Sequence, residues 1–432
     1  MNTNIERALE NLKANNRRYA KFERYYAGVH ELSFATEKFA NAFGSQFREF
    51  AMNLCPAVCD AIKDKLKITG FAIASSADDA GSQIDRIWHA NRMDLRSGEI
   101  HKEALKNGDA YAIVWPDDNG RAAIFPNNAA NLAVTYSDDA PGKILHASKF
   151  WRTADKHTRL NLYFPDRIEK YVTSKPAETH LPEATEFVPI VADGTGALQP
   201  ELFEGARLSA GTSHIVPNPY GIVPVFHFAN NADLGMPGRS ELEAAIPIQD
   251  GLNKSVLDML VAMEFSAYRQ RWVAGIEVLT DPDGKEIQPF KTGADRLWVA
   301  SDHNSRFGDF DTTELDQFLK VKDSFRIDIA SVTGTPLHYL MPHMRGQPSG
   351  ETLKKSESRF IAKVRDRQAA FGQTWADLME FALLIEGRSP AVRLKTKWED
   401  PSPMSDRERL ENILLKKEIG LSTEKALEEV SF

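Results

Sequence analysis

Cysteine is nearly absent from this sequence, and long apolar runs are absent altogether. Its 432 residues include two cysteines, Cys55 and Cys59. Their four-residue separation matches neither a redox Cys-x-x-Cys pair nor half of a zinc site, so we interpret them as buried or half-buried free thiols. The longest apolar stretches, such as 259–263, fall far short of the ~20 residues of a membrane helix. The polar start of the chain is unlike a secretion signal, and we expect a soluble protein made inside the cell.

The motifs of common enzyme classes are missing as well. The sequence has no Gly-x-x-x-x-Gly-Lys-Ser/Thr phosphate loop, no His-Glu-x-x-His pair and no Gly-x-Ser-x-Gly turn. His338 and His343 share one proline-containing segment, but their spacing is not that of metal ligands. Acidic neighbours such as Asp117 and Asp118 fall in predicted turns, where Asp is favoured for backbone reasons. We therefore expect no catalytic, cofactor or metal site, and a protein that is not an enzyme.

The composition is that of a globular protein with a sizeable core. Apolar residues make up 42% of the chain and charged residues 26%. The formal charge is -8, so the chain as a whole has no positive electrostatic field that would indicate a nucleic-acid ligand. The length suits two or three domains.

The first half of the chain combines helices with an antiparallel sheet. Residues 1–65 and 75–109 have helical patterns, and the latter reads as two helices. From Ala110 the period changes to two, and an Asp-Asp-Asn-Gly turn predicts a hairpin over 110–126. Strand patterns continue to about residue 231, interrupted by a Pro- and Gly-rich segment, 174–216, that suggests loops or an insertion. An aromatic set is expected to form helical core: Phe34, Phe39, Phe43, Phe47 and Phe50. The predicted fold class is α+β.

The second half alternates helices with shorter elements. Pro247 suits the first turn of its helix or a kink, and Gly334 and Pro336 suit a helix end. The expected succession is a helix within 238–272, short strands and turns over 273–312, a helix over 313–334, a loop over 335–350, a helix from 351 to about 386, and a charged helix or helix pair over 403–432.

This order of elements, with several sequence pieces, resembles the portal proteins of tailed bacteriophages, the head-to-tail connectors. The pieces are RYYAGVHELSFATEKFANAFG (24–44), NLCPAVCDAIKDKLKITGF (53–71), EALKNGDAYAIVWPDDNG (103–120), NPYGIVPVFHFANN (218–231), GRSELEAAIPIQDGLNKSVLDMLVAMEF (238–265) and IASVTGTPLHYL (329–340). The resemblance is closest to portals of phages that infect actinobacteria. It covers nearly the whole chain, except 174–216.

The resemblance implies a division of the chain into named parts. These are N-terminal helices and an α+β wing (1–237), a first stem helix (238–272), a clip (273–312), a second stem helix (313–334), a tunnel loop (335–350), a long wing helix with its following segment (351–399) and a short helical crown (400–432).

It also implies a function and a set of partners. A ring of twelve copies would occupy one vertex of the capsid in the virion and conduct double-stranded DNA during packaging and ejection. The implied partners are further copies of the chain, DNA bound without sequence preference, the large terminase or packaging motor, a head-tail adaptor, and the major capsid and scaffolding proteins, with no membrane and no cofactor. Three alternatives stay open: another ring-forming head-completion or minor capsid protein, a DNA-packaging enzyme, which the missing phosphate loop disfavours, and a cellular scaffold.

Two groups of residues are expected to carry this function. Leucine and methionine in the tunnel loop offer adaptable apolar contact without fixed charge, and Arg345 is the permanent cation there. The tunnel-loop residues are His338, Leu340, Met341, His343, Met344, Arg345 and Gln347. The stem residues expected between subunits are Leu252, Val256, Met259, Met263, Phe318, Phe325 and Ile329.

Overall fold

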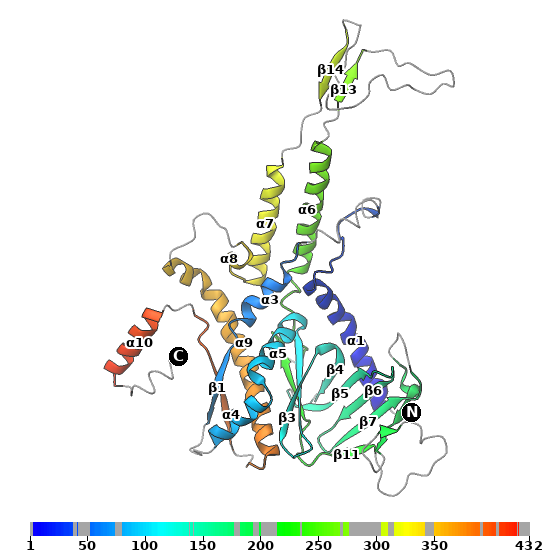
Figure 1. Cartoon of the computed structure of the whole chain (residues 1–432), viewed down its shortest axis with the longest axis vertical. Coiled ribbons are helices and arrows are strands. Elements are labelled where there is room, and N and C mark those ends of the chain that lie inside the picture. The colour runs from blue at the N-terminus through cyan, green and yellow to red at the C-terminus, as the bar shows by residue number, and fades with distance from the viewer. Residues whose placement is uncertain are drawn as a thin grey trace. The chain divides into compact units, whose positions relative to one another are not determined.

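The computed structural model resolves the chain into two compact units (Figure 1). It describes residues 3–37, 41, 52–73, 80–137, 139–140, 142–176, 182–192, 198–199, 214–233, 236–267, 271–275, 304–309, 315–341, 350–388, 392–402, 406–420 and 422. Unit 1 comprises Met1–His30, Asn53–Gln249 and Arg326–Phe432, and unit 2 comprises Glu31–Met52 and Asp250–Phe325.

Unit 1 contains most of the sheets and most of the helices. Its helices are α1 (Thr3–Tyr26), α3 (Cys55–Lys63), α4 (Ala80–Ala90), α5 (Met93–Asn107), α8 (Leu337–Leu340), α9 (Gly350–Ile385) and α10 (Asp406–Glu418), with 3-10 turns η1 (Ala129–Asn131) and η2 (Ala184–Glu186). Its strands are β1 (Ile68–Ile73), β2 (Asp109–Pro116), β3 (Ala122–Asn127), β4 (Leu132–Tyr136), β5 (Ile144–Arg152), β6 (Thr158–Tyr163), β7 (Arg167–Thr173), β8 (Phe187–Pro189), β9 (Val191–Ala192), β10 (Leu198–Gln199), β11 (Ile215–Pro217), β12 (Val225–Ala229) and β15 (Leu394–Trp398).

The strands form antiparallel sheets, which confirms the predicted α+β class. The largest sheet has the order β11-β7-β6-β5-β4, with β8 also paired to β7, and a second has the order β12-β2-β3. The β2–β3 hairpin closes as predicted, because Asp117 Oδ1 accepts the backbone N–H groups of Asn119 at 2.9 Å and Arg121 at 2.8 Å. Figure 1 shows α1 lying across the large sheet, where its buried side packs on residues such as Leu160 and Leu162.

Helix α9 forms the other centre of unit 1. Phe360, Phe371, Trp375 and Leu378 recur at helical spacing along it and are buried, as the sequence pattern predicts. The helix packs against β12 and against β15, which follows it in the chain and pairs with β1. The sequence pattern missed the β1–β15 pair.

Unit 2 contains most of two helices and a strand pair. Helix α6 (Ile246–Ala267) begins in the last residues of unit 1, and Pro247 falls in its first turn as predicted; α7 (Asp316–Thr333) ends in unit 1. A Cβ atom on Gly251 would lie 3.0 Å from the ring of Phe325, so the two helices approach closely there. Strands β13 (Arg271–Ala274) and β14 (Arg306–Asp309) pair antiparallel. The predicted turn at 280–286 and strand at 296–300 lie outside the described residues.

One local prediction was wrong. Residues 27–36 are not helical, and Phe34 has a left-handed backbone (φ 61°) with a side chain that is 73% exposed, so it belongs to no core. The other four phenylalanines of that set lie outside the described residues. The segment 174–216 was expected to hold loops or an insertion, and its described part contains short strands. Strands β8 and β11 add to the large sheet because each pairs with β7.

Candidate functional site

The described part of the predicted tunnel loop is fastened to α9. His338 Nε2 lies 3.0 Å from Glu357 Oε1, and the Glu357 side chain is almost completely buried. Tyr339 packs beside both His338 and Phe360. Leu340 is 3% exposed, so it anchors the segment inside the chain and has no free surface for a ligand.

The rest of that loop remains a prediction. Met341, which ends the described range 315–341, is half-buried. His343, Met344, Arg345 and Gln347 lie outside the described residues.

The predicted stem residues separate into two groups by burial. Leu252 and Ile329 are fully buried within the chain, which removes them from the set that could face a neighbouring subunit. Val256, Met259, Phe318 and Phe325 are half-buried, and Met263 is 45% exposed. These five keep apolar surface that other molecules can contact.

A buried charge cluster in unit 1 joins α7, α9 and the segment leading into α6. Glu241 Oε2 lies 2.5 Å from Lys363 Nζ, and Glu241 Oε1 lies 3.0 Å from an Arg367 guanidinium nitrogen. Asn230 Nδ2 donates a further hydrogen bond to Oε1 at 3.1 Å. Burial alone would raise the pKa of Glu241, but the charges of Lys363 and Arg367 outweigh it and hold that pKa below its usual value. We call Glu241, Lys363 and Arg367 the helix joint.

The joint also reaches the end of α7. Lys363 Nζ donates a hydrogen bond of 2.7 Å to the carbonyl oxygen of Thr333, the last residue of that helix. A cation at a helix C-terminus complements the helix dipole. A cavity of about 360 Å³ adjoins the joint and is lined by residues from the same three segments.

A second buried network centres on Asp109 in β2. Its carboxylate is fully enclosed and accepts hydrogen bonds from Tyr19 Oη at 2.6 Å and from the backbone N–H of Gly238 at 2.8 Å, with Arg18 also bound. His227 Nε2 lies 2.8 Å away. Burial would raise the pKa of Asp109, but its contact with His227 and the hydrogen bond from Tyr19 hold it below the usual value. The carboxylate thereby ties α1, β2, β12 and the loop at 238 together.

His101 on α5 is a buried neutral base. The Trp375 indole donates its N–H to His101 Nε2 at 2.9 Å, and the imidazole stacks on Phe371. Burial lowers the pKa of His101 to about 3, because a charged ring would lose its hydration in this aromatic surrounding.

Stability should therefore fall as the pH drops from 6.5 to 5. In the unfolded chain His101 binds a proton near its ordinary pKa of ~6.5, whereas the folded chain excludes it, so acid favours unfolding by up to about 1.4 kcal/mol per pH unit and by about 1.6 kcal/mol over this range. Urea unfolding at pH 5, 6 and 7 measures the slope. His101→Gln should flatten the slope by that amount whatever its stability at pH 7, and equal slopes for the two proteins would disprove the effect.

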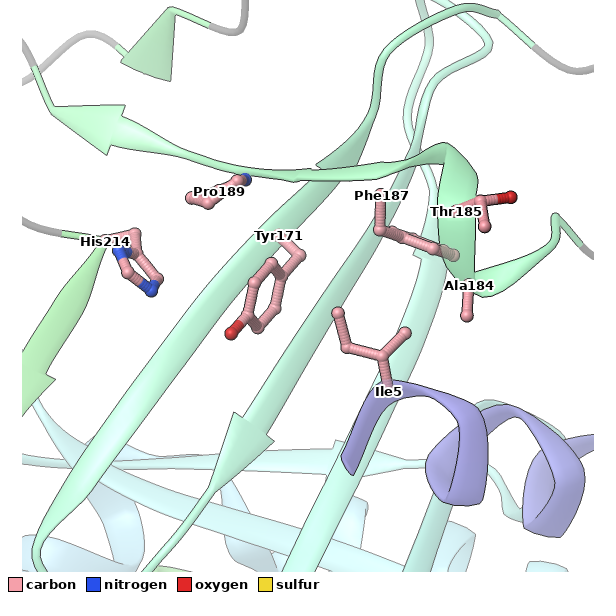
Figure 2. Close-up of a pocket in the computed structure, with 7 residues that line it drawn as sticks. All are labelled: Ile5, Tyr171, Ala184, Thr185, Phe187, Pro189 and His214. Atoms are coloured by element: carbon pink, nitrogen blue, oxygen red, sulfur yellow. The ribbon is translucent and has the colours of Figure 1, made fainter. Parts of the chain in front are cut away.

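A hollow of about 430 Å³ lies at the edge of the large sheet (Figure 2). Figure 2 shows the Tyr171 and Phe187 rings, His214, Pro189 and Ile5 around it. The Tyr171 hydroxyl donates to Glu169 at 2.8 Å. Apart from Thr185, the lining side chains are apolar or aromatic, and the centroids of the Tyr171 and His214 rings lie 5.6 Å apart.

The described parts of the chain contain no group of three or more side chains arranged to hold a metal ion. Within those same parts, no helix has the length and apolarity needed to cross a bilayer.

Comparisons with known proteins assign the chain to a family. The family model "Phage portal protein, SPP1 Gp6-like" matches residues 5–432. The portal protein of Mycobacterium phage L5 is 24% identical over 354 residues, covering 79% of this chain and 67% of the relative. The portal protein of Mycobacterium phage D29 is 24% identical over 357 residues, with the same coverage of 79% and 67%.

A solved structure shows the same fold at low identity. A chain from the neck of an empty GTA particle, computed with C6 symmetry, has a TM-score of 0.50 and 11% identity, covering 92% of this chain and 94% of that one. A chain from the neck of a native GTA particle, computed with C12 symmetry, has a TM-score of 0.48 and 11% identity, covering 93% and 95%. With a family model that spans almost its whole length, the chain belongs to the phage portal protein family, SPP1 Gp6-like.

Proposed function

We propose that copies of this chain assemble into a ring at one capsid vertex, and that the ring is the channel through which double-stranded DNA is packaged and ejected. The observation that best supports a ring is the partly exposed apolar surface of α6. Apolar residues occur on nearly all sides of this helix, yet Val256, Met259, Leu260 and Met263 keep exposed surface. A helix that is apolar all round is normally enclosed by protein.

Helix α7 leaves apolar surface uncovered as well. Leu319 is 47% exposed and Val321 is 44% exposed. Burying such side chains against another copy contributes roughly 25 cal/mol per Å² of apolar area. A closed ring offers every copy the same contact, and the fold neighbour from a neck computed with sixfold symmetry supports a symmetric assembly.

The proposal assigns roles to the parts named above. The ring number we propose is twelve, and the 335–350 loop contacts the passing DNA through Met341, His343, Met344, Arg345 and Gln347. The clip at 273–312 docks the packaging motor and later the head-tail adaptor, and the wing and crown meet the capsid and scaffolding proteins. A net charge of -8 per chain suits a channel that lets DNA slide, because dense phosphate contacts would hold it.

Negative-stain electron microscopy of the purified chain tests the ring. We expect end-on views with rotational symmetry and a central hole of roughly 20 Å or more, wide enough for a DNA duplex. Monomers or compact dimers without a hole, across a range of salt and protein concentrations, would overturn the proposal.

Disrupting the stem contact should separate the subunits. Met263→Gln with Leu319→Gln removes two exposed apolar side chains, and we expect rings to give way to monomers in size-exclusion chromatography with light scattering. Leu145→Gln is the control, because Leu145 is 45% exposed on β5 and lies outside the stem. Unchanged rings in the double variant, or equal dissociation of the control, would contradict the role of α6 and α7.

A further inference from the structure

The exposed side of α1 carries a row of positive charges. Lys13, Arg17, Lys21 and Arg24 are all exposed, and each follows the previous one by three or four residues, so they lie on one side of the helix. At ~1.5 Å per residue they span about 16 Å. We call these four residues the basic face.

Most of the buried residues of α1 lie on the side of the helix away from Lys13, Arg17 and Lys21. The other side of α1 is buried through Leu9, Leu12, Tyr19, Phe22 and similar residues. Arg18 points inward and binds Asp109. In contrast, neither Lys13 nor Arg17 forms an ion pair with any residue that the structure describes, and Lys21 lies 5.9 Å over the Tyr25 ring.

The local charge opposes that of the whole chain. The protein carries 61 acidic and 53 basic residues, yet the acidic residue of α1 between Lys13 and Arg24 is Glu23, which is half-buried and pairs with Lys106 at 2.6 Å. The basic face begins at Lys13, after Glu10, which is an exposed acidic residue. Neighbouring exposed cations such as Lys13 and Arg17 repel one another in the free protein, and a polyanion relieves that repulsion.

We propose that the basic face binds the phosphate backbone of double-stranded nucleic acid, without sequence preference. A duplex presents one negative charge per ~1.7 Å of its axis, so a row of cations about 16 Å long faces several phosphates at once. The exposed residues between the cations include Ala14 and Ala20, whose small side chains let a rod-shaped ligand approach the helix closely.

An acidic protein surface fits the basic face less well. Protein interfaces are anchored by aromatic and other large apolar side chains at their centre, and α1 exposes none of these among its described side chains. The binding is independent of the proposed channel, because a single chain carries the complete basic face.

Binding to relaxed circular plasmid DNA tests the proposal separately from the channel, because a closed circle cannot thread through a closed ring. The measurement compares the full-length chain with the variant Lys13→Gln, Arg17→Gln, Lys21→Gln, Arg24→Gln over a range of salt concentrations. We expect the variant to bind at least about tenfold more weakly. The slope of log K against log salt should become shallower by about 3.6, at ~0.9 for each phosphate that a cation of the basic face neutralises.

A matched variant removes the same charge elsewhere. Lys143, Lys395, Lys397 and Lys417 are exposed, and replacing these four with glutamine should leave circular-DNA affinity within about twofold of the wild type. Equal affinity of the basic-face variant and the wild type, or equal weakening in both variants, would overturn the proposal. Tighter binding of the wild type to a polyglutamate peptide than to the plasmid would also overturn it. Thermal melting of each variant, and its ring images, show separately whether folding and assembly persist.

Discussion

Gly238→Ala is expected to lower the free energy of unfolding by more than about 4 kcal/mol, the range of severe backbone and packing clashes. A Cβ atom at position 238 would lie 1.9 Å from the carbonyl oxygen of Gly108 and 2.7 Å from the backbone nitrogen of Asn230. Neither atom is free to move, because Asn230 N–H donates to that same oxygen at 2.7 Å. Gly238 N–H also donates to the buried Asp109. Urea unfolding followed by circular dichroism measures the decrease.

Gly98→Ala is the matched control for this prediction. Gly98 lies inside α5, and a Cβ atom there would meet nothing within 4 Å. Alanine is favoured over glycine in helices by ~1 kcal/mol, so this variant should be as stable as the wild type or slightly more stable. If Gly238→Ala unfolded at the same urea concentration as Gly98→Ala, the close approach of the two backbones would be disproved.

Glu241→Gln is expected to cost about 3–5 kcal/mol of unfolding free energy, the usual effect of removing one member of a buried ion pair. The substitution preserves the size of the side chain but leaves Lys363 and Arg367 without their shared counter-charge. Arg367 is almost fully buried, so water cannot replace Glu241 beside its guanidinium, and among the described residues only the exposed Asp366 carboxylate still pairs with it. Urea unfolding at neutral pH measures this cost, with the assembly state held the same for each protein.

Two further variants separate the charge of the joint from its packing. Glu243→Gln removes a carboxylate that is 60% exposed and lies 4.0 Å from Arg239, and it should change the stability by less than about 0.5 kcal/mol. Replacing the joint as a set, with Glu241→Leu, Lys363→Met and Arg367→Met, should recover most of the stability, because no buried charge is then left unpaired and the Asp366 carboxylate that loses Arg367 is 70% exposed. Equal stability of Glu241→Gln and Glu243→Gln would show that the ion pairs of the helix joint do not stabilise the fold.

Local patterns were sufficient to predict most helices and the hairpin, whereas contacts between distant segments were not predictable from them. Helix α9 has apolar residues at a regular helical period over many turns, and the β2–β3 turn has Asp and Gly where its geometry needs them. Strands β1 and β15 are short, and more than 300 residues separate their partners in the register, such as Ile73 with Leu394. Nothing within either strand specifies the other.

The helix joint was missed, although the sequence contains a signal for it. Arg367 follows Phe360 and Val364 and precedes Phe371 on one helical stripe, so a charge falls among residues predicted to be buried. Such a charge needs a partner, but the partner, Glu241, lies 126 residues away. The pattern predicts that an anion exists, and only the fold identifies it.

The predicted stem set shows a different limit of pattern analysis. An apolar stripe marks surface that will be buried, but it does not state which chain provides the cover. Leu252 and Ile329 find that cover within their own chain, while Met263 does not. The roles proposed for the remaining stem and loop residues stay predictions until the ring is imaged.

The three-way contact of Lys363 has a mechanical consequence. Helix α7 is continuous, and its last carbonyl is held by a side chain of α9 that also grips the segment entering α6. A force along α7 therefore reaches α9 and the segment leading into α6 through the Lys363 side chain. Moving α7 or that segment away from α9 breaks a contact of Lys363. Enclosed charges are screened far less by salt than exposed ones. Salt concentrations that weaken the proposed binding of a polyanion to α1 should therefore leave the helix joint intact.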